Sequence, residues 1–178
     1  MRKHNGMKPQ DVVILLKIAS LGGQPFLQKD IAEELQISKS ELSESLNRSV
    51  QAGLLMPDKS RVMSLGLLEF LKGGLRYVFP TTPGKVVRGI PTSHSAPPLN
   101  EIIVSGKDVY VWPFAKGNLR GQAIEPIYDF APDVIARDKK LYELLALADA
   151  LRVGKAREKT LAAEILEKKI KEYAAQQQ

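Results

Sequence analysis

The chain has 178 residues, of which 44% are apolar and 26% are charged, and it contains no cysteine. These fractions are those of an ordinary folded protein, and the lack of cysteine excludes disulfides, a thiol nucleophile and thiolate metal sites. The formal net charge of +6 permits binding to nucleic acid, but it is spread as +2, +3 and +1 over residues 1–74, 75–126 and 127–178.

Several classes of protein are excluded by what the sequence lacks. Its apolar runs of five or six residues are too short to cross a membrane, and its first residues lack the apolar core of a secretory signal, so we expect a cytoplasmic protein. With only His4 and His94, a metal centre would depend on carboxylates, and we expect no metal and no cofactor. Composition changes near residues 75 and 127 predict an α+β chain in three parts.

The first part, residues 1–74, is predicted to be helical with one short ribbon. Helical periodicity predicts helices over residues 11–21 and 28–35, followed by a sharp turn at Gln36. Ser38 and Glu41 then form a capping box that starts a helix ending near residue 52, before Gly53. Residues 54–56 and 61–63 flank the turn 57–60 as a β-hairpin. A last helix over 64–72 is expected to end at the Gly73–Gly74 pair.

This order resembles the winged helix-turn-helix of MarR-like bacterial transcription regulators. The resemblance rests on residues 27–43 (LQKDIAEELQISKSELS) and 52–55 (AGLL), and it extends over residues 8–74. In that pattern a helix with a small residue, here Ala32, crosses closely under a recognition helix, and Ile37 fills the gap beneath the turn. Gln36 stands where glycine is common, which predicts a strained turn costing about 1 kcal/mol.

The resemblance implies a sequence-specific DNA-binding regulator, with base and phosphate contacts from the recognition helix and the wing. The implied contact residues are Lys39, Ser40, Ser43, Glu44, Asn47, Arg48, Gln51, Lys59 and Arg61. Ser40, Ser43 and Glu44 are suited to base edges, and Asn47 to an adenine. Arg48 and Lys39 suit guanine or phosphate. The alternative is that these polar residues only form a solvated helix face.

The middle part, residues 75–126, is rich in proline and glycine and carries β-type runs at 75–79, 101–104 and 108–112. The pattern Tyr-Val-aromatic-Pro, Gly, Arg-Gly occurs at 77–89 and again at 110–121, which predicts one hairpin unit used twice. The plain interpretation is two hairpins packed on each other. The second is that Arg88 and Arg120 converge on a small anionic effector or an acidic partner, and the third is that the two copies resemble each other by chance.

Ser93, His94 and Ser95 lie between the two copies. No nucleophile elbow, phosphate-binding loop or zinc motif accompanies them, so we expect His94 to be a hydrogen-bonding loop residue and the protein not to be an enzyme.

The last part, residues 127–178, predicts two helices, over 138–152 and 155–174, separated by Gly154. Their apolar stripes suit either the protein's own core or a dimer seam, and the resemblance favours the seam because such regulators bind two half-sites as two-fold dimers.

Two functions follow from this organisation. The first is a homodimeric regulator that binds double-stranded DNA. The alternative is a winged-helix module that binds protein, as a subunit of a complex or an antitoxin-like partner, without binding DNA.

Overall fold

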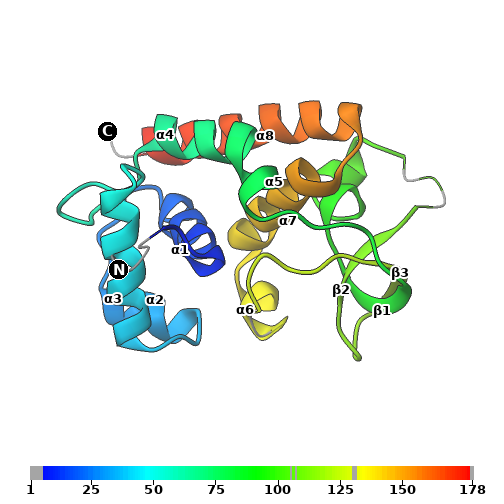
Figure 1. Cartoon of the computed structure of the whole chain (residues 1–178), viewed down its shortest axis with the longest axis horizontal. Coiled ribbons are helices and arrows are strands. Elements are labelled where there is room, and N and C mark those ends of the chain that lie inside the picture. The colour runs from blue at the N-terminus through cyan, green and yellow to red at the C-terminus, as the bar shows by residue number, and fades with distance from the viewer. Residues whose placement is uncertain (1–5, 105, 107, 130–131, 177–178) are drawn as a thin grey trace, which may run out of the picture.

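The architecture is α+β, with helices at one end of the long axis and along it, and a small three-stranded sheet at the other end (Figure 1). The structure is a computed structural model that describes residues 6–104, 106, 108–129 and 132–176. The helices are α1 (Pro9–Ser20), α2 (Gln28–Glu34), α3 (Lys39–Gln51), α4 (Ser64–Glu69), α5 (Leu75–Val78), α6 (Pro132–Arg137), α7 (Lys139–Val153) and α8 (Ala156–Ala175). The strands are β1 (Val86–Pro91), β2 (Tyr110–Pro113) and β3 (Leu119–Ala123). The expected α+β class is confirmed.

The first three helices form where the sequence predicts them. Pro9 occupies the first turn of α1, where its missing N–H costs nothing. The residues of α1 from Asp11 to Ser20 are all buried, because the helix packs against α3 on one side and against α7 and α8 on others. Gln36, between α2 and α3, has a φ of +55°, so the strained turn expected there is present.

The ribbon after α3 is shorter than expected. Leu55 and Val62 form a single antiparallel bridge, supported by backbone hydrogen bonds from Met56 N to Arg61 O (3.0 Å) and from Met63 N to Leu54 O (2.9 Å). The predicted hairpin is therefore reduced to one bridged pair around a tight turn.

The helix after the ribbon does not end at Gly73–Gly74, and the strand predicted at 75–79 is wrong. The chain passes from α4 through a π-helical turn, Phe70–Gly74, directly into α5. The cause is the spacing of Leu67, Leu71 and Leu75, which places three fully buried side chains on one helical face. Burying that face outweighs the cost of about 1 kcal/mol for each glycine in a helix.

The prediction of a duplicated hairpin is also wrong, because of this helix. The first Tyr-Val-aromatic-Pro run ends α5, whereas the second is strand β2, so the same motif has two conformations. The strand expected at 101–104 is also wrong. That stretch begins in a 3-10 turn, Leu99–Glu101, and does not form a strand. Val104 is 96% exposed, while Ile103 packs against the edge of the core.

The sheet is small and tightly wound. β1 is antiparallel to both β2 and β3, and β2 is parallel to β3, so each strand pairs with the other two. Such closeness requires glycine, since a Cβ atom on Gly89 would lie 2.0 Å from the Trp112 carbonyl oxygen, and one on Gly117 would lie 2.2 Å from that of Gly89. The glycines of the repeated motif thus set how closely the strands cross.

The C-terminal helices α7 and α8 confirm the predicted pair and its break at Gly154, while the short α6 before them was not predicted. Their apolar stripes complete the protein's own core together with α1. The buried residues of these stripes include Leu141, Leu144, Leu145, Leu151, Ala162, Leu166 and Ile170. In a dimer of chains folded in this way, the seam would be formed by other residues. Within the described ranges, no helix is long and apolar enough to span a lipid bilayer.

Candidate nucleic-acid interface

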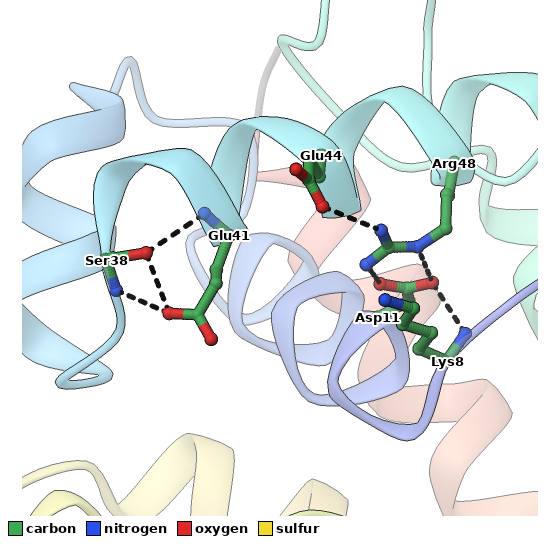
Figure 2. A network of polar contacts seen from close by, with 6 residues as sticks. All are labelled: Lys8, Asp11, Ser38, Glu41, Glu44 and Arg48. Atoms are coloured by element: carbon green, nitrogen blue, oxygen red, sulfur yellow. Dashed lines mark hydrogen bonds and ion pairs between the residues drawn. The ribbon is translucent and has the colours of Figure 1, made fainter.

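Helix α3 is the element that the sequence singled out, and its first turn is closed by the predicted capping box (Figure 2). The Ser38 hydroxyl accepts a hydrogen bond from the Glu41 N–H (3.1 Å), and the Glu41 carboxylate accepts from the Ser38 N–H (3.0 Å) and from its hydroxyl (2.8 Å). The hydrogen bonds from the Ser38 side chain and backbone lower the pKa of Glu41 below its ordinary value. The cap fixes the position and start of α3.

One face of α3 is buried, and the opposite face is open to solvent. Leu42, Ser45, Leu46 and Ser49 are buried. Lys39, Ser40, Glu44, Asn47 and Gln51 are exposed, and Ser43 is half-buried. The exposed residues at spacings of four, three and four form a single stripe along the helix, which consists of Ser40, Glu44, Asn47 and Gln51.

Most polar side chains on the exposed face of α3 are available for contacts. Among the residues that the structure describes, Lys39, Ser40, Asn47 and Gln51 make no side-chain hydrogen bond or ion pair. The stripe therefore offers a hydroxyl and two amides, groups that can donate to and accept from base edges.

Arg48 departs from the expectation, because its guanidinium group is occupied inside the protein (Figure 2). Its Nε donates to Asp11 Oδ2 (2.9 Å) and its Nη2 to Asp11 Oδ1 (2.7 Å), while Nη1 lies 3.8 Å from Glu44. The Arg48 side chain is 12% exposed, and that of Asp11 is fully buried. Hydrogen bonding to Asp11 raises the pKa of Arg48. Moving Arg48 to a phosphate would leave a buried carboxylate unpaired, so the structure assigns it to the α1–α3 junction.

Asp11 is the residue that the sequence analysis missed. It lies in the first turn of α1, where an acidic residue is common, and its carboxylate also accepts from the Lys8 N–H (2.8 Å). That position gave a local signal for a helix start, but no pattern linked it to an arginine 37 residues further along the chain.

The predicted wing residues lie on the turn beyond α3. Lys59 is half-buried and has a φ of +61°, and Arg61 is exposed. Arg61 also lines a cleft bordered by Ile18, Met63 and Ile170, which joins the ribbon to the ends of α1 and α8. Both residues thus belong to the ribbon that follows α3.

The structure brings Arg88 and Arg120 together. They are directly opposite partners in the antiparallel pairing of β1 with β3, and both are exposed. The convergence suggested by the repeated motif is therefore present in the strand register, even though the two copies of that motif fold differently.

The middle segment is attached to α7 by a buried polar cluster. The Asp149 carboxylate accepts hydrogen bonds from Thr92 (2.8 Å), from the Trp112 indole N–H (2.6 Å) and from Arg152 (2.7 Å). Arg152 also donates to the backbone oxygens of Phe79 (2.8 Å) and Glu125 (3.1 Å). Burial raises the pKa of Asp149, and the charge of Arg152 and these hydrogen bonds oppose that rise. This cluster holds loops in place and is closed to solvent.

His94 is a hydrogen-bonding loop residue, as predicted. Its Nε2 lies 2.7 Å from the Asp108 carbonyl oxygen, and its Nδ1 lies 3.5 Å from Glu158. The neighbouring Ser95 hydroxyl accepts from the Tyr110 N–H (2.9 Å), so it is not paired with the imidazole.

In the part of the chain that is described, no group of three or more His, Asp or Glu side chains is arranged to hold a metal ion. Comparison with models of protein families, with curated proteins and with solved structures found no match.

Proposed function

We propose that this protein is a sequence-specific, DNA-binding transcriptional regulator that acts as a homodimer, with a winged helix-turn-helix of the MarR-like kind in its first 74 residues. The observation that carries the proposal is the open polar stripe of α3, whose amide and hydroxyl side chains have no partners within the described residues. A capped helix that presents such a stripe suits the major groove, where donors and acceptors distinguish the base pairs.

The surrounding elements support this proposal. Helices α2 and α3 are joined by a four-residue turn, and a bridged ribbon with Lys59 and Arg61 follows α3. In helix-turn-helix proteins, the N-terminal residues of the second helix contact base edges. Ser40 and Ser43 are therefore proposed to contact bases near the start of α3, and Asn47 to pair with an adenine. Lys39 is proposed to contact guanine or phosphate, and Glu44 to accept from a cytosine amine.

Because Arg48 is paired with Asp11, it is left out of the proposed DNA contacts, and the affinity for DNA must come from other residues. On the exposed face of α3, the positive charge of Lys39 is opposed by the negative charge of Glu44, whose side chain is 66% exposed. One recognition helix then supplies specificity but little electrostatic attraction to phosphates. The proposal therefore depends on the basic residues of the ribbon and on two copies of the helix in a dimer.

The dimer of this proposal needs a surface other than the C-terminal stripe, which is buried in the core. Leu65, 76% exposed on α4, lies beside the cleft that Met63, Ile170 and Ala174 line. The exposed side chains of Leu65, Met63 and Ala174 supply an apolar surface for a contact between two copies. Light scattering of the wild type and of Leu65→Glu measures this directly, and the proposal expects the substitution to shift the mass from dimer to monomer.

DNA binding is tested by mobility shift, with the DNA upstream of the protein's own gene, at several salt concentrations. We expect a shift that resists random-sequence competitor, and Ser40→Ala and Asn47→Ala should each weaken it by about 1–3 kcal/mol. Asn100→Ala, an exposed asparagine on a distant 3-10 turn, is the matched control and should have no effect. The absence of any competitor-resistant shift at physiological salt would contradict the proposal.

The low positive charge of α3 favours one alternative, in which the same fold binds a protein as a subunit of a complex or as an antitoxin-like partner. In that case no DNA shift appears, and a co-purifying protein is released by the same Ser40 and Asn47 substitutions.

A further inference from the structure

The pairing of β1 with β3 holds two arginines side by side. Arg88 and Arg120 are directly opposite partners, and directly opposite residues of an antiparallel pair point to the same face, with Cβ atoms about 5 Å apart. Both side chains are exposed, and no ion pair of either one is present among the described residues. Two guanidinium groups therefore share one open surface.

This arrangement opposes folding stability. Like charges placed directly opposite on a sheet destabilise it. The register nevertheless cannot slip, because Gly89 and Gly121 lie against neighbouring backbone, where a Cβ atom would lie 2.0 Å and 2.5 Å from a carbonyl oxygen. Since side chains alternate along a strand, the arginine before each glycine must face outward. The sheet thus holds two positive charges side by side, although their repulsion does not stabilise the folded protein.

The strands that carry the pair contain no acidic residue. Over residues 79–100 and 109–124 the charged side chains are Lys85, Arg88, Lys116 and Arg120, with no aspartate or glutamate. The nearest acidic residue before β2, Asp108, pairs with Lys155 at 3.0 Å. The charges carried by the three strands and by the turn between β2 and β3 are therefore all basic, with the exposed Glu101 and Glu125 just outside these ranges. We call the surface that presents Arg88 and Arg120 the β1–β3 face.

We propose that the β1–β3 face binds the phosphate backbone of duplex DNA without reading its sequence. Exposed guanidinium groups hold a single small anion weakly, because water screens each contact, whereas a polymer with regularly spaced phosphates adds the contacts together. The choice of duplex DNA rests on the proposed function. This face lies at the opposite end of the long axis from α3, so the two contacts can be removed independently (Figure 1).

The test measures binding of a labelled random-sequence duplex by fluorescence anisotropy over a series of salt concentrations. For Arg88→Gln/Arg120→Gln we expect the slope of log affinity against log salt to fall in magnitude by about 2, and the affinity near 50 mM salt to fall roughly tenfold. Arg88→Lys/Arg120→Lys keeps both charges and should keep most of the affinity. Lys139→Gln/Lys168→Gln removes two exposed charges elsewhere and should change neither quantity.

The outcomes separate this inference from the proposed function. The inference is overturned if the Arg88→Gln/Arg120→Gln protein keeps its affinity for DNA and its salt slope. It is also overturned if inorganic pyrophosphate competes for the wild type as effectively as unlabelled DNA does at the same concentration of phosphate groups. If the wild type prefers no DNA sequence but loses random-duplex binding in this variant, the proposed function fails and the inference holds. Loss of preferred-site binding in Asn47→Ala, with random-duplex binding unchanged, supports both. An unchanged melting temperature excludes unfolding of the double variant as the cause.

Discussion

Two buried aspartate–arginine pairs hold different regions of this molecule, and they do so differently. Asp11 and Arg48 come from α1 and α3, two helices whose apolar faces already pack together. Asp149 and Arg152 lie one turn apart on α7, and their remaining hydrogen-bonding groups reach outward to the middle segment. The first pair reinforces a contact between helices, whereas the second connects a helix to loops that have little regular structure.

The difference reflects how each region obtains its stability. The helices bury periodic apolar stripes against one another. The Asp11–Arg48 pair therefore fixes how α1 and α3 align, at an interface that apolar packing already forms. The middle segment consists of short strands and irregular loops. Its Leu99 and Trp112 pack into the same core as α7, and polar groups add further contacts, including the bond from the Tyr142 hydroxyl to the Pro91 oxygen (2.8 Å). Removing one polar group there should affect several chain segments at once.

The largest effect is expected from Asp149→Ala. It leaves the Arg152 charge buried and takes the acceptor from Thr92 and Trp112, so we expect a loss of about 4 kcal/mol in the free energy of unfolding. Urea unfolding followed by fluorescence measures it, since Trp112 is the single tryptophan of the chain. Glu164→Ala, at an exposed site on α8, is the control and should change stability little. A loss below about 1 kcal/mol would mean that the middle segment does not depend on this cluster.

A smaller loss, about 3 kcal/mol, is expected from Arg48→Met, which leaves the Asp11 carboxylate buried with the Lys8 N–H as its remaining donor. Adding Asp11→Asn should recover part of that loss, and the double-mutant cycle then gives the coupling between the two side chains. Hydrogen exchange should show faster opening in α3 but not in β1–β3. Equal loosening of both regions would contradict the distinction between the two pairs.

The smallest effect is expected at the surface of α3. Ser38→Ala removes the cap and should cost about 1 kcal/mol, while the neighbouring Ser40→Ala should cost nothing measurable. Because the folded state lowers the pKa of Glu41, its contribution is present above its ordinary pKa of 4.5 and is lost as the pH falls below that value. Thermal melts between pH 6 and 3 should show this acid-side loss in the wild type, and a reduced loss in Ser38→Ala.

The regular helices were predictable because their signals are local. The capping box at Ser38 and Glu41, the periodic leucines of α7 and the break at Gly154 each determine structure within a few residues. The conformation of residues 75–78 was not predictable in this way. Leucine, tyrosine and valine in sequence favour a strand, but the fully buried Leu75 continues the apolar face of the preceding helix against α7, and this tertiary contact decides the outcome.

The candidate site shows the same division. The exposed residues of α3 follow from the helical period once its core face is known, so Ser40 and Asn47 were placed correctly on the open side. Arg48 was not, because whether an arginine faces solvent or a buried carboxylate depends on a partner 37 residues away. The opposed arginines of β1 and β3 were suggested by a repeat whose two copies fold differently, and it was the strand register that brought them together.

The helical path through residues 69–78, together with the burial of α1 on several sides, bears on how this protein could be divided. A fragment ending at residue 74 would cut that path just before Leu75 and would strip α1 of the covering that α7 and α8 provide. The polar stripe of α3 is thus not a detachable module. Helix α1, which packs against α3 on one side, packs against α7 and α8 on others, so α3 and the C-terminal helices share one supporting helix.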